Sequence, residues 1–328
     1  MWGGWLTVCD MPPGTLLPVA ETEDQYDAIA DDDDLIRPGV DALCAELGLD
    51  GEEVDRFDDG SLPVYAIGAN RVLKLYPGVY AEEAGIESSV LDAIDGRLSI
   101  PTPVPERVGE FEGWTYLLMS RLRGTSLARV WRRLPPDNRA SVAENLGTAL
   151  AELHAVNTPA VDELGPADWA EFIEDQRANC LERQLESGLA PAWAEQIPEF
   201  LDSVDLHTEA TSALLHCEVM GEHLLVTPGD EGWELSGLFD FEPAMRGASE
   251  YDFASVGLFV TAGDSTALRT LLTAYGYGAD RLTPETSRRL LAYALLHCSG
   301  TLPWYLRRLP APAEPTLEAA AQAWWGLG

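Results

Sequence analysis

The chain has 328 residues, of which 46% are hydrophobic, so it is long enough to bury a large core divided between two lobes. Its 55 acidic residues outnumber its 21 basic ones and give a formal net charge of −34. This charge disfavours nucleic acid and anionic membrane surfaces as partners. It is compatible with a cationic small molecule, and a solubilising or salt-adapted acidic surface is the commoner explanation of such a charge.

Targeting signals are not evident in the sequence. No apolar run approaches the ~20 residues that cross a bilayer, and the first residues lack the basic segment and apolar core of a signal peptide. The five cysteines are odd in number and form no C-x-x-C pair, which is typical of a reduced protein. We therefore expect a cytoplasmic protein, and the sequence leaves its oligomeric state open.

Residues 1–50 are predicted to form an N-terminal extension and an edge helix. Residues 1–40 are rich in acids and turn formers, including the run from Asp31 to Asp34, and we interpret them as an extension or a short helix. Residues 40–49 carry apolar side chains at helical spacing and end beside two glycines, which predicts a helix there.

Residues 51–121 are predicted to form a small, β-rich lobe. A loop at residues 57–63 precedes two strands, residues 64–67 and 71–76, that are joined by a short turn as in a β-hairpin. A helix with an apolar stripe and several acids follows at residues 81–94, and further strands lie around residues 110–119.

Lys74, on the second strand of this hairpin, is the only lysine in the chain. Strand alternation places Val72, Lys74 and Tyr76 on one face of the sheet. All the other residues in the count of Lys and Arg are arginines. The lysine at position 74 therefore indicates that a compact ammonium group is required there.

Residues 122–328 are predicted to form a larger, mainly helical lobe. His154 ends one of its helices, and we interpret it as a packing or capping histidine rather than a ligand. The predicted helices of this lobe are residues 141–156, 168–185, 191–204, 251–260, 283–296 and 316–325.

The segment from residue 214 to residue 254 is the only part of this lobe that is predicted to form strands. Two apolar runs flank a polar insert that holds His216, Glu218 and His223, and a third run ends at Asp240. Carboxylates at the ends of short buried strands are typical of a site on a rigid scaffold. An ordinary hairpin with exposed acids is the alternative interpretation.

The two lobes together supply the residue types that phosphoryl transfer needs. A lysine on a strand can neutralise nucleotide phosphates, and a glutamate on a helix can hold that lysine in place. One carboxylate at a strand end can bind a metal ion, and another can receive the proton of a hydroxyl group.

The order and spacing of these residues resemble the aminoglycoside phosphotransferase family of kinase-like small-molecule kinases. Members of that family carry a His-Gly-Asp sequence, an asparagine five positions after its aspartate, an Asp-Phe pair, a glycine and a Tyr-Asp pair. The corresponding residues of this chain are His216-Cys217-Glu218, His223, Asp240-Phe241, Gly247 and Tyr251-Asp252.

The resemblance implies an α+β, bilobal protein-kinase-like fold and cofactors ATP and Mg²⁺, with Mn²⁺ as a possible substitute. It implies that Lys74 engages the phosphates, that Glu87 holds Lys74 (with Glu83 as second choice), and that Glu218 is the catalytic base. Asp240 and His223 would bind metal, and Asp252 would fix the catalytic loop. The implied nucleotide contacts are Gly60 and Ser61 of the loop and Met119 and Ser120 of the hinge.

Three positions depart from the family pattern, and all three lie in the catalytic loop. Cys217 replaces glycine, Glu218 replaces aspartate, and His223 replaces asparagine. A nucleophilic Cys217 beside His216 is a further interpretation, but it explains fewer of the neighbouring residues.

The sequence is compatible with three functions. The first is an ATP-dependent kinase of a cationic aminoglycoside, or of a hygromycin-type compound, that gives antibiotic resistance. The second is a kinase of another alcohol such as choline, homoserine or a macrolide. The third is a nucleotide-binding module without catalysis.

Overall fold

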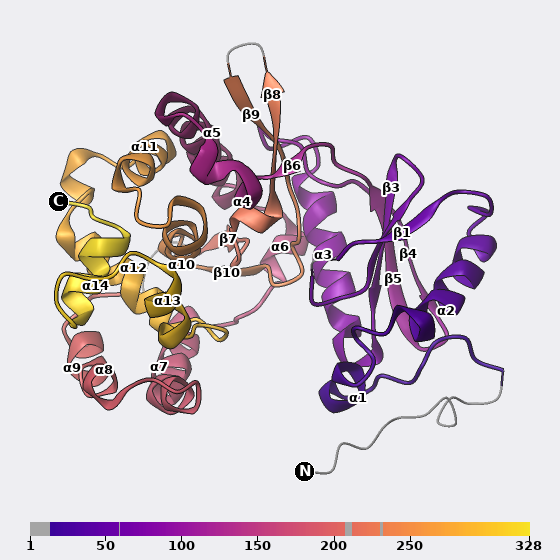
Figure 1. Ribbon diagram of the computed structural model, residues 1–328, viewed down its shortest axis with the longest axis horizontal. Helices are drawn as coiled ribbons and strands as arrows, with labels where there is room; N and C mark the ends of the chain where they lie inside the picture. Colours follow the sequence, from indigo (N-terminus) through magenta and orange to yellow (C-terminus); the bar gives the residue numbers. More distant parts are fainter. Residues whose placement is uncertain (1–13, 59, 207–211, 230–231) are drawn as a thin grey trace. The chain divides into compact units, whose positions relative to one another are not determined.

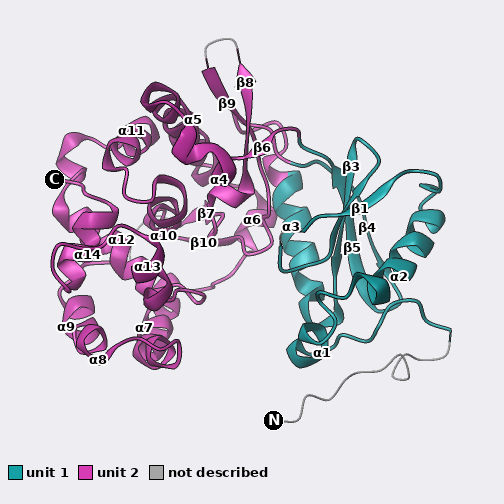
Figure 2. Ribbon diagram, viewed as in Figure 1, with its two compact units in different colours: residues 1–92, 103–122 teal, residues 93–102, 123–328 magenta. Residues whose placement is uncertain are grey.

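The computed structural model describes residues 14–58, 60–206, 212–229 and 232–328. The chain divides into two compact units (Figure 2): unit 1 comprises residues 1–92 and 103–122, and unit 2 comprises residues 93–102 and 123–328. The first 13 residues of the expected N-terminal extension, including Cys9, lie outside the described residues.

Unit 1 is built on a five-stranded antiparallel sheet with strand order β1-β2-β3-β5-β4. The predicted hairpin is confirmed as β2 and β3, with Val64 opposite Lys74. Sequence reasoning missed β1, a three-residue strand in an acidic stretch that is too short to show a period. The strands are β1 (Val54–Arg56), β2 (Val64–Ile67), β3 (Arg71–Tyr76), β4 (Pro105–Phe111) and β5 (Trp114–Ser120).

The two longer helices of unit 1 lie on opposite sides of this sheet (Figure 1). Tyr65 is opposite Leu73 in the register, so both side chains point to one face, where the Tyr65 hydroxyl donates to Asp33 at 2.7 Å. Lys74 points to the other face and meets Glu87. The helices are α1 (Glu23–Asp27), α2 (Asp33–Glu46), the 3₁₀ turn η2 (Gly78–Tyr80) and α3 (Ala81–Ile94).

Helix α2 begins earlier than the sequence indicated. The aspartate run expected in an extension or short edge helix instead supplies Asp33 and Asp34 to the first turn of this 14-residue helix. Acidic side chains are stabilising there because the helix dipole is positive at its N-terminus. The buried stripe of α2 consists of Ile36, Val40 and Leu43, whose spacing is helical.

Unit 2 is mainly helical and carries two small sheets, one with order β6-β8-β9 and one that pairs β10 with β7. Strand β6 corrects the expectation that residues 214–254 hold every strand of this lobe, because a two-residue strand carries no readable period. The strands are β6 (Thr125–Ser126), β7 (Ala213–Leu215), β8 (Leu224–Gly229), β9 (Gly232–Leu238) and β10 (Met245–Gly247).

The predicted helices of unit 2 form, with some changes at their ends. The single helix expected at residues 191–204 is instead α8 and α9, because Pro198 lies in the first turn of α9 and starts a new helix. The α-helices are α4 (Leu127–Val130), α5 (Pro136–His154), α6 (Pro159–Asp162), α7 (Trp169–Glu186), α8 (Pro191–Ala194), α9 (Ile197–Asp202), α10 (Glu250–Ser255), α11 (Ser265–Tyr275), α12 (Pro284–Leu296), α13 (Leu302–Arg308) and α14 (Leu317–Trp324). The remaining turns are η3 (Trp131–Arg133), η4 (Gly221–His223), η6 (Ala279–Arg281) and the π-helical η5 (Val256–Thr261).

Helices α5 and α11 cross at Gly147, where their backbones nearly touch. A Cβ atom added to Gly147 would lie 2.1 Å from the carbonyl oxygen of Leu271 in α11. Since real Cβ atoms do not approach so closely, glycine is required for this crossing. Among the described residues, none of the helices is both long enough and apolar enough to span a membrane.

Gly147→Ala should therefore destabilise the protein by about 1–3 kcal/mol, because α11 must move away from α5 to admit the methyl group. The matched control is Gly85→Ala in α3, where nothing lies within 4 Å of the added Cβ. That change should stabilise the helix by up to about 1 kcal/mol, because alanine has the higher helix propensity. Chemical denaturation of both variants measures the difference, and equal free energies of unfolding would contradict the close crossing.

Candidate active site

In unit 1, Lys74 forms a buried ion pair. Its Nζ lies 3.0 Å from Glu87 Oε2, and the side chains are only 4% and 1% exposed. The Tyr76 hydroxyl donates to the same Glu87 oxygen. Burying a carboxylate is costly unless it is paired and hydrogen-bonded, and these two donors meet that requirement. The lysine thus pairs with Glu87, the first choice from the sequence.

Of the predicted nucleotide-binding residues of unit 1, Met119 and Ser120 lie on the same sheet as Lys74, and Gly60 and Ser61 lie in the loop between β1 and β2. Gly60 has φ 128°, which favours glycine, and the carbonyl of Ser61 accepts a hydrogen bond from the Tyr26 hydroxyl. Met119 and Ser120 end β5, opposite Val72 and Arg71 of β3. Their contact with a nucleotide stays a prediction.

In unit 2, Asp252 holds the start of the predicted catalytic loop. Its fully buried carboxylate accepts the backbone N–H of His216 at 3.0 Å and that of Cys217 at 2.7 Å. These two amides directly precede Glu218, so Asp252 fixes the backbone from which the predicted base projects. This contact fits the expectation that Asp252 fixes the loop.

Cys217 has a left-handed backbone with φ 69°, a conformation that favours the glycine of the family pattern. A side chain in this region costs on the order of 1–2 kcal/mol, which the two hydrogen bonds to Asp252 offset. Burial, and next the nearby Asp252 carboxylate, raise the pKa of the Cys217 thiol well above its usual value. The thiol therefore stays protonated, which argues against Cys217 as a nucleophile.

His216 is a neutral packing residue beneath the loop. Burial, with a smaller contribution from His223, lowers its pKa below the ordinary histidine value. Its Nε2 lies 3.0 Å from the Phe239 carbonyl oxygen and must donate, because a carbonyl can only accept. The His216 ring also packs against the Phe241 ring, with 4.6 Å between the ring centroids.

His223 connects the catalytic loop to Asp240. Its Nδ1 lies 2.9 Å from the carbonyl oxygen of Glu218, and its Nε2 lies 3.1 Å from Asp240 Oδ2. Since a carbonyl only accepts, Nδ1 carries a hydrogen; a carboxylate also only accepts, so the contact of Nε2 with Asp240 is a hydrogen bond when Nε2 carries a hydrogen as well. The structure thus brings together three residues that the sequence placed in one site.

Glu242 is a further acidic residue at this place, and sequence reasoning missed it. Carboxylate oxygens of Asp240 and Glu242 lie within 4.8 Å of one another. Two carboxylates supply the hard oxygen donors that Mg²⁺ prefers, whereas an imidazole nitrogen is a poorer ligand for that ion. The donor set of Asp240 and Glu242 therefore fits a divalent cation. An acid two positions after Asp240 was the available signal.

A family model described as the phosphotransferase enzyme family (APH) matches residues 53–286. The chain belongs to this family.

A curated relative of this phosphotransferase is viomycin phosphotransferase from Streptomyces vinaceus, which is 27% identical over 237 residues that span 69% of this chain and 79% of the relative. Similar solved structures include the GDP complex of aminoglycoside 2'-phosphotransferase-IIIa, with TM-score 0.65, 16% identity, and 77% of this chain and 87% of that chain covered. Another is macrolide 2'-phosphotransferase MphH from Brachybacterium faecium, with TM-score 0.59 and 22% identity; the match covers 78% of this chain and 89% of that chain.

These comparisons confirm the family resemblance and the α+β kinase-like fold, with a β-rich lobe and a helical lobe. The chain is accordingly a phosphotransferase of the small-molecule kinase type. The functions of the individual site residues remain predictions.

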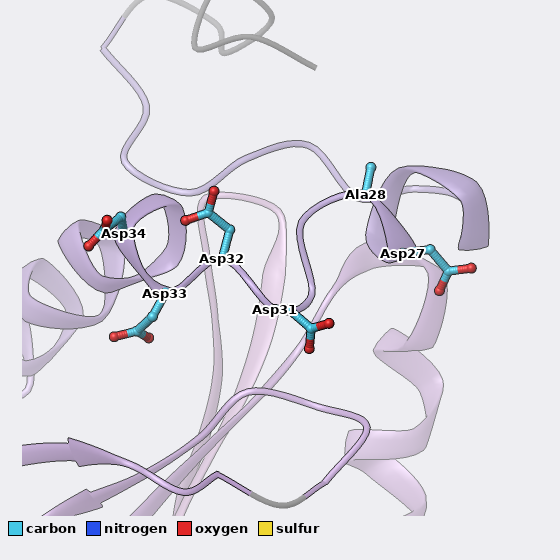
Figure 3. Close-up of a pocket in the computed structure, with 6 residues that line it drawn as sticks. All are labelled: Asp27, Ala28, Asp31, Asp32, Asp33 and Asp34. Atoms are coloured by element: carbon cyan, nitrogen blue, oxygen red, sulfur yellow. The ribbon is translucent and has the colours of Figure 1, made fainter. Parts of the chain in front are cut away.

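One pocket of the phosphotransferase is lined by acids near the start of α2 (Figure 3). Its lining residues are Asp27, Ala28 and the run from Asp31 to Asp34. Figure 3 shows these carboxylates pointing in different directions, and Asp33 already accepts hydrogen bonds from Tyr65 and Arg56. The cluster contributes to the acidic surface of unit 1, and its side chains do not converge on a ligand.

Cys298 differs from the other described cysteines because it is exposed. A hydrogen bond from His297 is the largest influence on its thiol, and it lowers the pKa of Cys298 to about 7. By contrast, burial raises the pKa of Cys44 and of Cys180 to about 11.

Iodoacetamide should therefore label Cys298 much faster than Cys44, Cys180 or Cys217, because the thiolate is the reactive form. The labelling rate should rise with pH through about 7 and level off above it, as the lowered pKa requires. Peptide mass spectrometry measures the rate at each cysteine. His297→Asn should move the midpoint to higher pH, and an unchanged midpoint would contradict the part played by His297.

Proposed function

We propose that this phosphotransferase transfers the γ-phosphoryl group of ATP to a hydroxyl group of a cationic antibiotic of the aminoglycoside type, and so gives resistance. One observation carries the proposal. His223 contacts the Glu218 backbone through one ring nitrogen and the Asp240 carboxylate through the other, so the proposed base and the proposed metal ligand belong to one fixed assembly.

Each residue has a definite part in the proposed reaction. Glu218 receives the proton of the attacking hydroxyl, and its extra methylene relative to aspartate places the carboxylate further from the backbone. Lys74, held by Glu87 and Tyr76, neutralises the α- and β-phosphates. Gly60, Ser61, Met119 and Ser120 contact the nucleotide.

Asp240, with Glu242 and His223 beside it, would hold the divalent cation. Mg²⁺ bound there supplies charge neutralisation for the phosphate oxygens, and Mn²⁺ would accept the histidine nitrogen more readily. His223→Asn tests whether the histidine is an adaptation. Lower activity in the variant means that the histidine contributes to turnover, and higher activity means that it does not.

The charge of the chain and its relatives support the class of substrate. A net charge of −34 attracts cations over long range and repels anionic molecules. Relatives are named for aminoglycosides, viomycin and macrolides, so hydroxyl-bearing antibiotics are the class to test first.

One experiment distinguishes the three functions. The purified protein is incubated with ATP or GTP, with Mg²⁺ or Mn²⁺, and with each member of a substrate panel, and mass spectrometry detects phosphate added to the substrate. The panel contains aminoglycosides, viomycin, a macrolide, choline and homoserine. We expect one phosphate on an aminoglycoside with ATP and none on choline or homoserine. Phosphorylation of only the macrolide or a simple alcohol would favour the second function. Nucleotide binding without any turnover would favour the third, which the substitutions at Cys217, Glu218 and His223 suggest.

Glu218→Gln should lower kcat by at least ~10²-fold, because the amide cannot accept the hydroxyl proton. The matched control is Glu222→Gln, an exposed glutamate in the same loop, which should keep the activity of the parent protein. Nucleotide affinity should be unchanged in both variants. A Glu218→Gln enzyme with normal kcat would remove Glu218 from the mechanism.

A further inference from the structure

His154 lies at the back of the catalytic loop, in contact with the residue that holds it. Its Nε2 lies 3.0 Å from Asp252 Oδ2, and its Nδ1 lies 2.9 Å from the hydroxyl oxygen of Tyr275. The side chains of His154 and Asp252 are 3% and 0% exposed. Asp252 thus accepts three hydrogen bonds, two from loop amides and one from a histidine.

The direction of each hydrogen bond in this group follows from the chemistry of the partners. The Asp252 carboxylate can only accept, so His154 Nε2 carries a hydrogen. Burial raises the pKa of Tyr275 above its ordinary value, so its hydroxyl keeps its proton and can donate to Nδ1. A histidine that donates from Nε2 to the carboxylate and accepts at Nδ1 from the hydroxyl is then fully paired.

The helix ends explain why these side chains meet. His154 is the last residue of α5 and Tyr275 is the last residue of α11, and the two helices approach closely because Gly147 has no side chain. Gly276, with φ 116°, ends α11 directly after the tyrosine. The rings of Tyr275 and Phe253 pack on the His154 ring, with 5.3 and 5.8 Å between the ring centroids, and limit its rotation.

We propose that Tyr275 is a positioning residue for phosphoryl transfer, whose hydroxyl fixes the His154 ring and through it the Asp252 carboxylate and the backbone of the catalytic loop. The inference rests on the proposed function in one respect: Glu218 is the base. Glu218 directly follows His216 and Cys217, whose backbone amides donate to Asp252. Without His154, one oxygen of Asp252 loses a donor, and the carboxylate can turn away from the His216 and Cys217 amides.

Tyr275→Phe tests this proposal with a close control. Tyr277→Phe removes a different phenol hydrogen bond, that of the Tyr277 hydroxyl to Glu250 Oε1 at 2.9 Å, which involves neither His154 nor Asp252. We expect Tyr275→Phe to lower kcat by roughly tenfold, the loss for one hydrogen bond, with an unchanged KM for nucleotide. We expect Tyr277→Phe to leave kcat unchanged.

Hydrogen exchange provides a readout that does not depend on turnover. Peptides that cover residues 214–219 should exchange faster in Tyr275→Phe than in the parent protein, and at the parent rate in Tyr277→Phe. Equal exchange and equal kcat in the two variants would overturn the proposal. If the parent protein phosphorylates nothing, the proposed function fails, whereas faster exchange in Tyr275→Phe alone still supports the hydrogen-bonded group.

Replacements of His154 separate a specific hydrogen bond from general packing. Glutamine keeps an N–H near the position of Nε2, whereas leucine fills similar space without a donor. We expect His154→Gln to retain most of the kcat and the slow exchange of residues 214–219, and His154→Leu to lose both. Equal losses in the two variants would show that His154 acts only through packing, which would also overturn the proposal.

Discussion

A buried carboxylate, that of Asp252, is the constraint on which the catalytic half of unit 2 depends. A buried charge is stable only if its lone pairs are satisfied, and here two loop amides and one histidine do so. The catalytic loop cannot move away without leaving this charge unpaired. Helix α10 supplies Asp252, α5 supplies His154 and α11 supplies Tyr275, so several helices are fixed around one group.

The same physical requirement governs unit 1. Glu87 is 1% exposed and is satisfied by Lys74 and by the Tyr76 hydroxyl, both from β3. Strand alternation presents residues 74 and 76 on one face, so a single strand supplies both donors to one helix residue. A lysine is suited to this place because its compact ammonium group fits beside the buried carboxylate of Glu87.

The unusual catalytic loop is compatible with an ordered site. Cys217 adopts a left-handed backbone that would suit glycine, but its amide is held by Asp252 and its thiol is buried and protonated. His223 replaces an asparagine and still contacts both the Glu218 backbone and Asp240. The substitutions therefore change the chemistry that the loop offers without removing the contacts that order it.

Local pattern determined much of this protein from sequence alone. The period of apolar residues predicted the β-rich and helical lobes and the lysine hairpin, and the family resemblance implied that Glu87 is the partner of Lys74. Very short elements such as β1 and β6 were missed, because two or three residues carry no period. The sequence signal for Glu242, its position two residues after Asp240, is weak in a chain with 55 acidic residues, and Glu242 was missed for that reason.

Only the tertiary structure decided how His154 is used. His154 and Asp252 are 98 residues apart in the chain, and His154 and Tyr275 are 121 apart. No periodicity links such positions, so the sequence favoured an ordinary packing histidine. The contact exists because two helices that cross at Gly147 end at the same place, and helix crossing depends on the packing of the whole core.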